Sequence, residues 1–333
     1  MTSRERVRRC LVFDSPDRIP RQLWLLHWAN LHHAESVAAI QQRFPDDLVS
    51  SPPCLSRPCH SQGAPQVRGL YTDEWGCVFE NVQDGVIGEV KHPLLGKWDE
   101  LDTIRIPEER LTLDRKQVDA FCASTDRYVL SGTCPRPFER LQFLRGTANL
   151  MVDLIDQPPE LRILLDRMHA FYVKELELWA RTGVDALSFM DDWGSQRALL
   201  ISPDLWRELF KPLYRDYIEI AHRRGKAAFM HSDGYILDIL PDLIELGLDA
   251  INCQVFCMGV ERLGESCAGR ITFWGELDRQ HILPFGTPDD VRQAVELMYQ
   301  ALYREGGVIA QCEFGAGARP ENVMAYFEAW ASL

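Results

Sequence analysis

Imidazole and carboxylate side chains stand at the ends of two apolar segments in the second half of this chain. His231 and Asp233 directly follow the short run AAFM, and Asp191 and Asp192 follow the run ALSFM. His231 and Asp233 are two residues apart, so on an extended chain their side chains point to the same face. Such a pair can hold a metal ion or transfer protons. The alternative is a hydrogen-bonded strand end in which the segment Asp233-Gly234 forms a turn.

Further polar residues follow other apolar segments in the same way. Glu276 lies in WGELD, Cys312 in AQCEFG, and Asn252 and Gln254 in INCQVF. Burying an unpaired carboxylate or imidazole costs several kcal/mol, so we expect these groups to be paired or ligated. Several apolar segments that each end in such a group are therefore better explained by one shared site than by chance.

The residue types suggest roles within that site. His231, Asp233, Cys312 and Glu276 are expected zinc ligands, and Asp192, Asp233 and Glu276 are expected proton-transfer groups. Adjacent carboxylates on a strand point to opposite faces, so only one member of the pair Asp191-Asp192 can face the site. The expected substrate contacts are Trp193, Gln196, Asn252, Gln254 and Arg145. The structural alternatives are a core cysteine at 312, a barrel seal at Trp193 and an ion pair between Glu276 and Arg279.

The segments that carry these residues alternate between strand and helix. From Arg127 onward we count six apolar strands, each followed by a helical segment, and IPRQLWLLHW supplies another strand near the start. Short connections between strand and helix indicate parallel strands, which are apolar on both faces. Seven or eight units favour a closed (β/α)₈ TIM barrel, in which the active site lies at the carboxyl ends of the strands. No G-x-G-x-x-G segment supports a dinucleotide-binding fold.

The chain is expected to form one barrel domain over residues 1–333. Residues 1–20 contribute an N-terminal helix, and residues 50–95 form an insertion that combines a Pro- and Ser-rich loop with a β-hairpin. The formal net charge of −13 argues against nucleic-acid and anionic-membrane partners. The ten cysteines form no repeated C-x-x-C pairs and no signal peptide is evident, so reduced thiols and a cytoplasmic location are expected.

Several blocks of the sequence resemble the uroporphyrinogen decarboxylase superfamily, which includes zinc-dependent, corrinoid-linked methyltransferases. The resemblance covers nearly all of the chain and implies the same barrel. It is carried by SPDRIP, DEWGCVFEN, FERLQFLRG, DDWGSQRALLISPDLWRELFKPLY, MHSDGYILDILPDLIELGLDAIN, ITFWGELDRQHILPFGTPDDV and ARPENV. The decarboxylase branch is a poor match, because Arg21-Gln22 is kept but the second arginine of its N-terminal signature is absent.

The methyltransferase branch implies a ligand set. Its H-x-C pair and late cysteine correspond to His231, Asp233 and Cys312, with aspartate replacing the first cysteine, and a further ligand position in related enzymes corresponds to Gln254. A set with carboxylate in place of thiolate is harder and more Lewis-acidic, which disfavours thiol methylation. The resemblance thus implies methyl transfer on a small methylated substrate, with zinc and with a separate corrinoid protein or a folate as methyl carrier.

Two other functions stay open at this stage. The first is a metal-free decarboxylase or lyase in which Arg136, Arg145 or Arg197 grips a substrate carboxylate. The second is a non-catalytic binding protein, which leaves the polar strand ends unexplained. Phe256 and Met258 suggest a lid or a homodimer contact.

Overall fold

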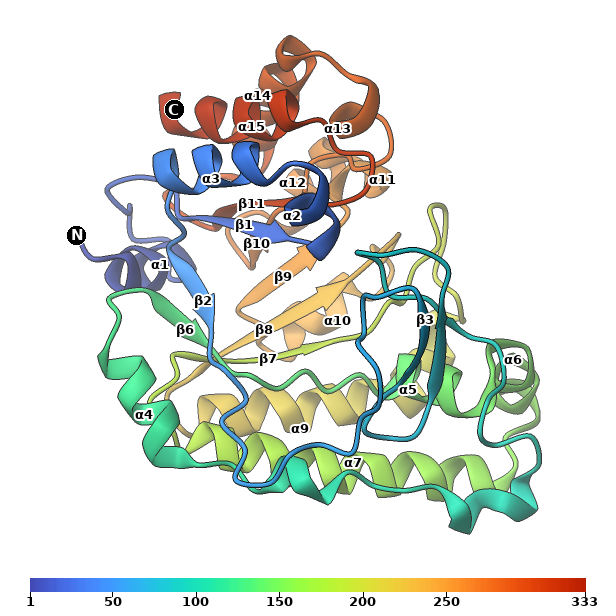
Figure 1. Cartoon of the computed structure of the whole chain (residues 1–333). Helices are drawn as coiled ribbons and strands as arrows, with labels where there is room; N and C mark the ends of the chain where they lie inside the picture. Colours follow the sequence, from blue (N-terminus) through green and yellow to red (C-terminus); the bar gives the residue numbers. More distant parts are fainter.

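The computed structural model describes residues 1–333, and eight parallel strands form its central sheet (Figure 1). The strand order is β1-β11-β10-β9-β8-β7-β6-β2, which confirms the predicted (β/α)₈ barrel. The strands are β1 (Arg21–Leu25), β2 (Leu48–Ser50), β6 (Tyr128–Leu130), β7 (Ala186–Met190), β8 (Ala227–Ser232), β9 (Ala250–Cys253), β10 (Thr272–Trp274) and β11 (Val308–Phe314). The short strand β2 is the barrel strand that the sequence pattern did not single out.

Helices surround the barrel and follow its strands (Figure 1). The outer core cluster contains most of the buried apolar residues and packs these helices on the sheet. The helices are α1 (Ser3–Leu11), α2 (His27–His32), α3 (Ala34–Arg43), α4 (Arg115–Ala123), α5 (Pro137–Arg145), α6 (Thr147–Asp156), α7 (Pro159–Ala180), α8 (Pro203–Leu209), α9 (Lys211–His222), α10 (Leu240–Glu245), α11 (Val255–Met258), α12 (Val260–Cys267), α13 (Ile282–Phe285), α14 (Pro288–Leu302) and α15 (Pro320–Ser332). None of them combines the length and apolar character that crossing a membrane demands.

A second, smaller sheet stands over one side of the barrel. It consists of the antiparallel strands β3 (Gly69–Thr72), β4 (Val78–Asn81) and β5 (Glu89–Val90). Two short 3₁₀ helices, η1 (Trp98–Thr103) and η2 (Glu108–Leu111), lead the chain back toward α4. Figure 1 shows β3 and its connections in front of the carboxyl ends of the barrel strands, where they can wall off a cavity.

The barrel interior is filled by inward-facing residues of all eight barrel strands, with Trp24 of β1 packed against the cluster as a partly buried member. Phe229, Trp274 and Ile309 belong to this inner cluster, together with Val7 and Cys10 of α1, which closes the amino-terminal end of the barrel. Side chains alternate between the two faces of a strand, so each inner residue determines which neighbours also face inward. This alternation positions the polar residues at the opposite end.

Side-chain carboxylates complete the hydrogen bonding between β1 and β2, the two strands at the ends of the strand order. Asp47 donates its backbone N–H to the Arg21 carbonyl at 2.9 Å, and its Oδ2 accepts the Arg21 N–H at 2.9 Å. Asp46 Oδ1 accepts the Leu23 N–H at 2.7 Å. Arg6 and Arg18 both contact the buried Asp47 carboxylate at 2.7 Å. The closure of the barrel therefore depends on two adjacent aspartates.

Asp46→Asn is expected to stabilise the protein at neutral pH by on the order of 1 kcal/mol. Burial raises the pKa of Asp46 to about 6, from 3.8, although the bond from Leu23 opposes this. The folded state thus holds the proton more tightly, and stability falls as the pH rises from about 4 to about 6. The asparagine side chain still accepts the Leu23 N–H. Because it does not ionise, it removes the loss of stability between about pH 4 and about pH 6. Urea unfolding at pH 4 and pH 7 tests it; an unchanged pH dependence in the variant contradicts the prediction.

Candidate active site

The alternation of side chains brings polar residues of four strands to the carboxyl-terminal mouth of the barrel. On β8, Phe229 faces inward, so His231 also faces inward, and Asp233 follows just past the strand end. On β9, Ala250 faces inward, and therefore so does Asn252. The register pairs His231 with Asn252 on neighbouring strands. These residues form one side of the candidate site.

Asn252 orients the His231 ring. Asn252 Nδ2 donates to the Trp274 carbonyl and, at 3.1 Å, to Gln311 Oε1, so its Oδ1 is the atom that faces His231 Nδ1 at 2.5 Å. An acceptor at Nδ1 places a proton on that nitrogen. His231 Nε2 then points toward two carboxylates, at 3.5 Å from Asp192 Oδ1 and 3.6 Å from Asp233 Oδ1. The position among these three atoms suits a proton or a cation.

The charges around His231 favour its protonated form in the absence of an ion. Burial lowers the pKa of His231, but Asp192, Asp233 and Glu276 outweigh this effect and raise the pKa to about 9. Burial also acts to raise the pKa of Asp192, while its interaction with His231 lowers that pKa overall. The two groups therefore stabilise each other's charge, as partners do in an ion pair.

Arg279 contacts three carboxylates next to this cluster. Its Nη2 lies 2.6 Å from Asp233 Oδ1, its Nη1 lies 2.7 Å from Glu313 Oε1, and its Nε lies 3.0 Å from Glu276 Oε2. From the sequence, Arg279 is expected only as a possible partner of Glu276. With Asp192 and His231 included, four carboxylates here face two basic side chains. The site therefore has a surplus of negative charge, which attracts cations.

Glu276 is buried without a hydrogen bond. Its side chain is 1% exposed, and neither carboxylate oxygen has a hydrogen-bond partner, because the close contact with Arg279 is not aligned as one. Burial, together with repulsion from Asp233 and Glu313, raises the pKa of Glu276 to about 7 despite the attraction of Arg279. Glu276 can thus exchange a proton near neutral pH. It lies outside the group of three donors formed by Asp192, His231 and Asp233, whose ligand atoms are all within 4.8 Å of one another.

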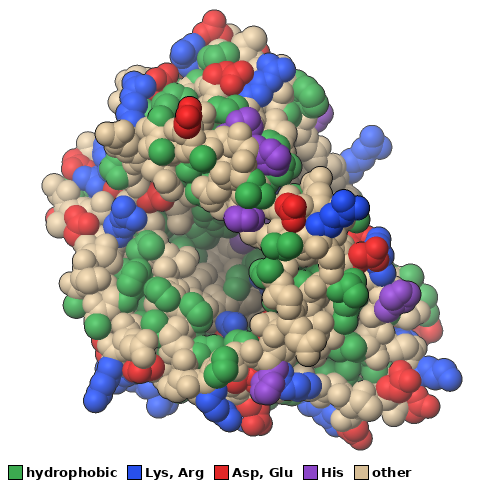
Figure 2. Space-filling view, in the orientation of Figure 1, with side chains coloured by type: hydrophobic (Ala, Val, Ile, Leu, Met, Phe, Trp, Pro, Cys, Tyr) green, Lys and Arg blue, Asp and Glu red, His purple; other side chains and the backbone are tan.

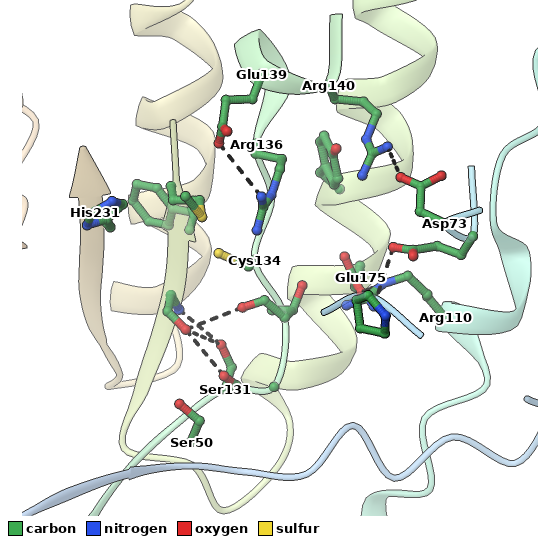
Figure 3. Close-up of a pocket in the computed structure, with 18 of the residues that line it drawn as sticks. Ser50, Asp73, Arg110, Ser131, Cys134, Arg136, Glu139, Arg140, Glu175 and His231 are labelled. Atoms are coloured by element: carbon green, nitrogen blue, oxygen red, sulfur yellow. Dashed lines mark hydrogen bonds and ion pairs between the residues drawn. The ribbon is translucent and has the colours of Figure 1, made fainter. Parts of the chain in front are cut away.

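A cavity of about 810 Å³ opens beside His231. Figure 2 shows the hollow in the face of the molecule, with hydrophobic side chains around it. Residues of β1, β6, β7 and β8 line its barrel side, and Asp73, Trp75 and Phe79 of the insertion line the opposite side. Figure 3 shows His231 at one side of the cavity, with Cys134 and Arg136 on another segment of the chain. A site of this size accommodates a small organic molecule.

Two of the expected site residues have structural roles instead. Trp193 is fully buried, stacks on Phe138 with ring centroids 4.3 Å apart, and donates its Nε1–H to Tyr214 at 2.9 Å. Arg145 is also buried, with its Nε 2.6 Å from Asp153 Oδ2 and its Nη1 bonded to the Leu95 carbonyl at 2.9 Å. Neither side chain lines the cavity. Both side chains are engaged in packing and hydrogen bonds within the protein, so their placement does not support the expected substrate contacts.

Cys312 does not join His231. Ile309 and Gln311 of β11 face the barrel interior, so Cys312 faces outward and is part of the outer core, where it is 0% exposed. The register agrees, since Cys312 pairs with Leu23, another outward-facing residue. The donor group around His231 does not include Cys312. The expected shared metal ion between these two residues is thus not supported by their placement.

The remaining expected residues lie at or near the rim. Gln196 and Gln254 are joined by a hydrogen bond of 2.8 Å and line a separate polar depression together with Arg279. Asp191 faces away from the cavity and accepts the backbone N–H groups of Phe138 and Glu139 at 2.9 and 2.8 Å. Asp192 is therefore the member of the pair that reaches the site. Adjacent residues on a strand point to opposite faces, so only one of the two aspartates could do so.

The arrangement as a whole defines a (β/α)₈ barrel with polar groups at the carboxyl ends of its strands, which is where barrel enzymes have their active sites. The family profile described as Uroporphyrinogen decarboxylase (URO-D) matches residues 72–333, most of the chain, and the protein belongs to this family.

A solved structure shares this fold. A methyltransferase from Methanosarcina mazei superimposes with a TM-score of 0.68 at 17% sequence identity, covering 100% of this chain and 99% of that chain. This likeness shows a shared fold. A Yersinia pestis DHPS with a pterine-sulfa conjugate covers 94% of this chain and 93% of its own, but its TM-score of 0.37 at 11% identity supports no inference. No curated protein sequence matches this chain significantly.

Proposed function

We propose that this protein is a metal-dependent, methyltransferase-like enzyme that acts on a small methylated substrate. The observation that carries the proposal is the convergence of Asp192, His231 and Asp233, whose ligand atoms all lie within 4.8 Å of one another beside the cavity. The URO-D family membership and the shared fold with a methyltransferase support the same reaction class.

The three donors fit a divalent cation. Asn252 leaves His231 Nε2 available, two carboxylate oxygens face it, and the surplus of negative charge favours an ion there. Nitrogen and oxygen donors without sulfur suit zinc acting as a Lewis acid more than zinc activating a thiol. When bound, the ion would polarise the atom from which the methyl group departs.

The chain's own residues supply the other requirements. Asn252 holds the imidazole in one tautomer, and Arg279 fixes the Asp233 carboxylate through a contact of 2.6 Å. Glu276 can take or give a proton at neutral pH, because its pKa is raised to about 7. We propose in addition that a separate corrinoid protein or a folate carries the methyl group, in keeping with the resemblance to corrinoid-linked enzymes.

The metal content of the purified protein tests the proposal. We expect about one zinc ion per chain by plasma mass spectrometry, and a loss of zinc in His231→Ala and in Asp192→Asn. Cys312→Ser is the matched control, since its sulfur faces the outer core and the variant should keep its zinc. A wild-type protein that never binds a divalent ion, even after incubation with zinc, would refute metal dependence.

A metal-free lyase or decarboxylase is the second candidate, and one observation favours it. The cavity contains the cation Arg136 as well as His231, whose raised pKa of about 9 keeps a proton on the ring. Such a pair could hold a carboxylate and protonate a carbanion. Turnover that persists after chelation, with carbon dioxide as product, would favour this candidate over methyl transfer.

A homodimer contact through Met258 is not supported, because that side chain is buried and its sulfur accepts the Ile236 N–H at 3.3 Å. Phe256 is partly buried beside Glu276 in a small depression. A homodimer therefore stays a proposal, and neither Phe256 nor Met258 provides an exposed contact residue for it.

A further inference from the structure

The three arginines that line the cavity differ in how well they are paired. Arg110 lies 2.7 Å from Glu175, and Arg140 bonds to Asp73, so both cations are neutralised in the cavity wall. Arg136 has only Glu139, with 3.8 Å between its Nη1 and Glu139 Oε2. No hydrogen bond joins this pair, and Glu139 Oε2 has no hydrogen-bond partner at all. Arg136 is thus the cavity arginine that lacks a close carboxylate partner.

Arg136 is held in place while its side chain stays accessible. The residue precedes α5, and Pro137 at the first helical position fixes the backbone there. Its side chain is 31% exposed and lines the cavity (Figure 3). A guanidinium that is enclosed on most sides binds an anion more strongly than one in open water.

The walls around Arg136 are suited to a flat molecule. Hydroxyl groups of Ser131 and Ser188 add polar contacts on the barrel side. The aromatic residues that line the cavity are Trp24, Tyr71, Trp75, Phe79, Phe143, Phe171, Tyr172, Phe189 and Trp274. Aromatic walls favour planar ligands through stacking and edge contacts. One loosely paired arginine among such walls favours a ligand with a planar body and a negative charge at one end.

We propose that Arg136 binds the carboxylate of a small planar substrate, whose body lies between the aromatic walls and whose other end reaches toward His231. This assignment rests on the proposed function in one respect, namely that the end of the substrate near His231 is the end that reacts. Glu139 competes little for the guanidinium, since burial raises the pKa of its own carboxyl group. The guanidinium can then form a two-pronged contact with an incoming carboxylate.

The test compares 2-naphthoate with 2-naphthamide, which share a shape and differ in charge. By isothermal titration calorimetry we expect the wild-type protein to bind naphthoate at least about 10-fold more tightly. Arg136→Gln should lose that preference and leave naphthamide binding unchanged, and Arg136→Lys should keep part of it. Arg197→Gln is the control, because Arg197 is an exposed arginine outside the cavity.

Three outcomes would overturn the proposal: equal affinity of the wild-type protein for both probes, a preference that survives in Arg136→Gln, or no saturable binding of either probe. The wild-type comparison stands even if Arg136→Gln fails to fold, which circular dichroism would reveal. The zinc content of each preparation separates this inference from the proposed function. A wild-type protein without zinc that still prefers naphthoate contradicts metal dependence and leaves the Arg136 site intact.

Discussion

Replacing His231 by alanine is expected to lower the rate of methyl transfer by more than about 100-fold, because loss of a metal ligand should cost more than the roughly 10- to 100-fold lost with a residue that only orients one. His231 Nε2 is the one nitrogen among the three donors, and it lies 3.5 and 3.6 Å from the two carboxylates. Without the ring, Asp192 and Asp233 repel each other. The group also loses its one member that lines the cavity. The measurement is single-turnover transfer of the methyl group, with zinc content determined on the same sample.

A substitution at Asn252 tests the same site with a smaller expected effect. Asn252→Ala leaves His231 in place but removes the acceptor at its Nδ1, so we expect a smaller loss of about 10- to 100-fold in zinc affinity or rate. Cys253→Ala alters the adjacent position on the opposite face of β9 and should leave transfer unchanged. A loss in Cys253→Ala as large as that in Asn252→Ala would indicate damage to the strand, and would contradict a specific role for the amide.

Replacing Arg279 by alanine is expected to destabilise the protein by about 3–5 kcal/mol, the cost of breaking a buried ion pair on one side. Arg279 is the cation that contacts Asp233, Glu276 and Glu313, and Glu276 is almost completely buried. Its removal leaves three carboxylates close together at the ends of neighbouring strands. Urea unfolding at neutral pH, followed by far-UV circular dichroism, measures the change.

A second substitution identifies the source of that loss. Glu276→Gln removes the most buried of the three charges, so in the Arg279→Ala background it should restore part of the lost stability. Arg279→Lys keeps the charge but not the three-way contact, and should lie between the wild type and alanine. A change below about 1 kcal/mol in Arg279→Ala would mean that the contacts behave as an exposed ion pair.

Part of the site could be read from spacing alone. His231 and Asp233 are two residues apart after an apolar strand, and this spacing is enough to place both side chains on one face. The opposite facing of Asp191 and Asp192 followed from the same alternation, although which of them faced the site did not. Apolar strands alternating with helices likewise predicted the barrel, because parallel strands buried on both faces need that composition.

The sequence missed β2 and misplaced Cys312 for related reasons. β2 is only three residues long, and its apolar content does not stand out from the loop that follows. β11 is buried on both faces, and its sequence VIAQCEF contains no clear alternation that reveals which residues face inward. Only pairing with β1 and β10 determines that Gln311 faces the barrel interior and Cys312 faces the helices.

The sequence by itself determined that acidic and imidazole groups end several parallel strands, since that follows from local composition and the two-residue repeat. The tertiary structure decided which of them meet, because contacts between distant segments depend on strand register and on the path of the loops. Register brought Asn252 to His231, and the insertion carried Asp73 and Trp75 to the cavity beside Arg136. The burial of Trp193 was decided in the same way, by its packing against Phe138.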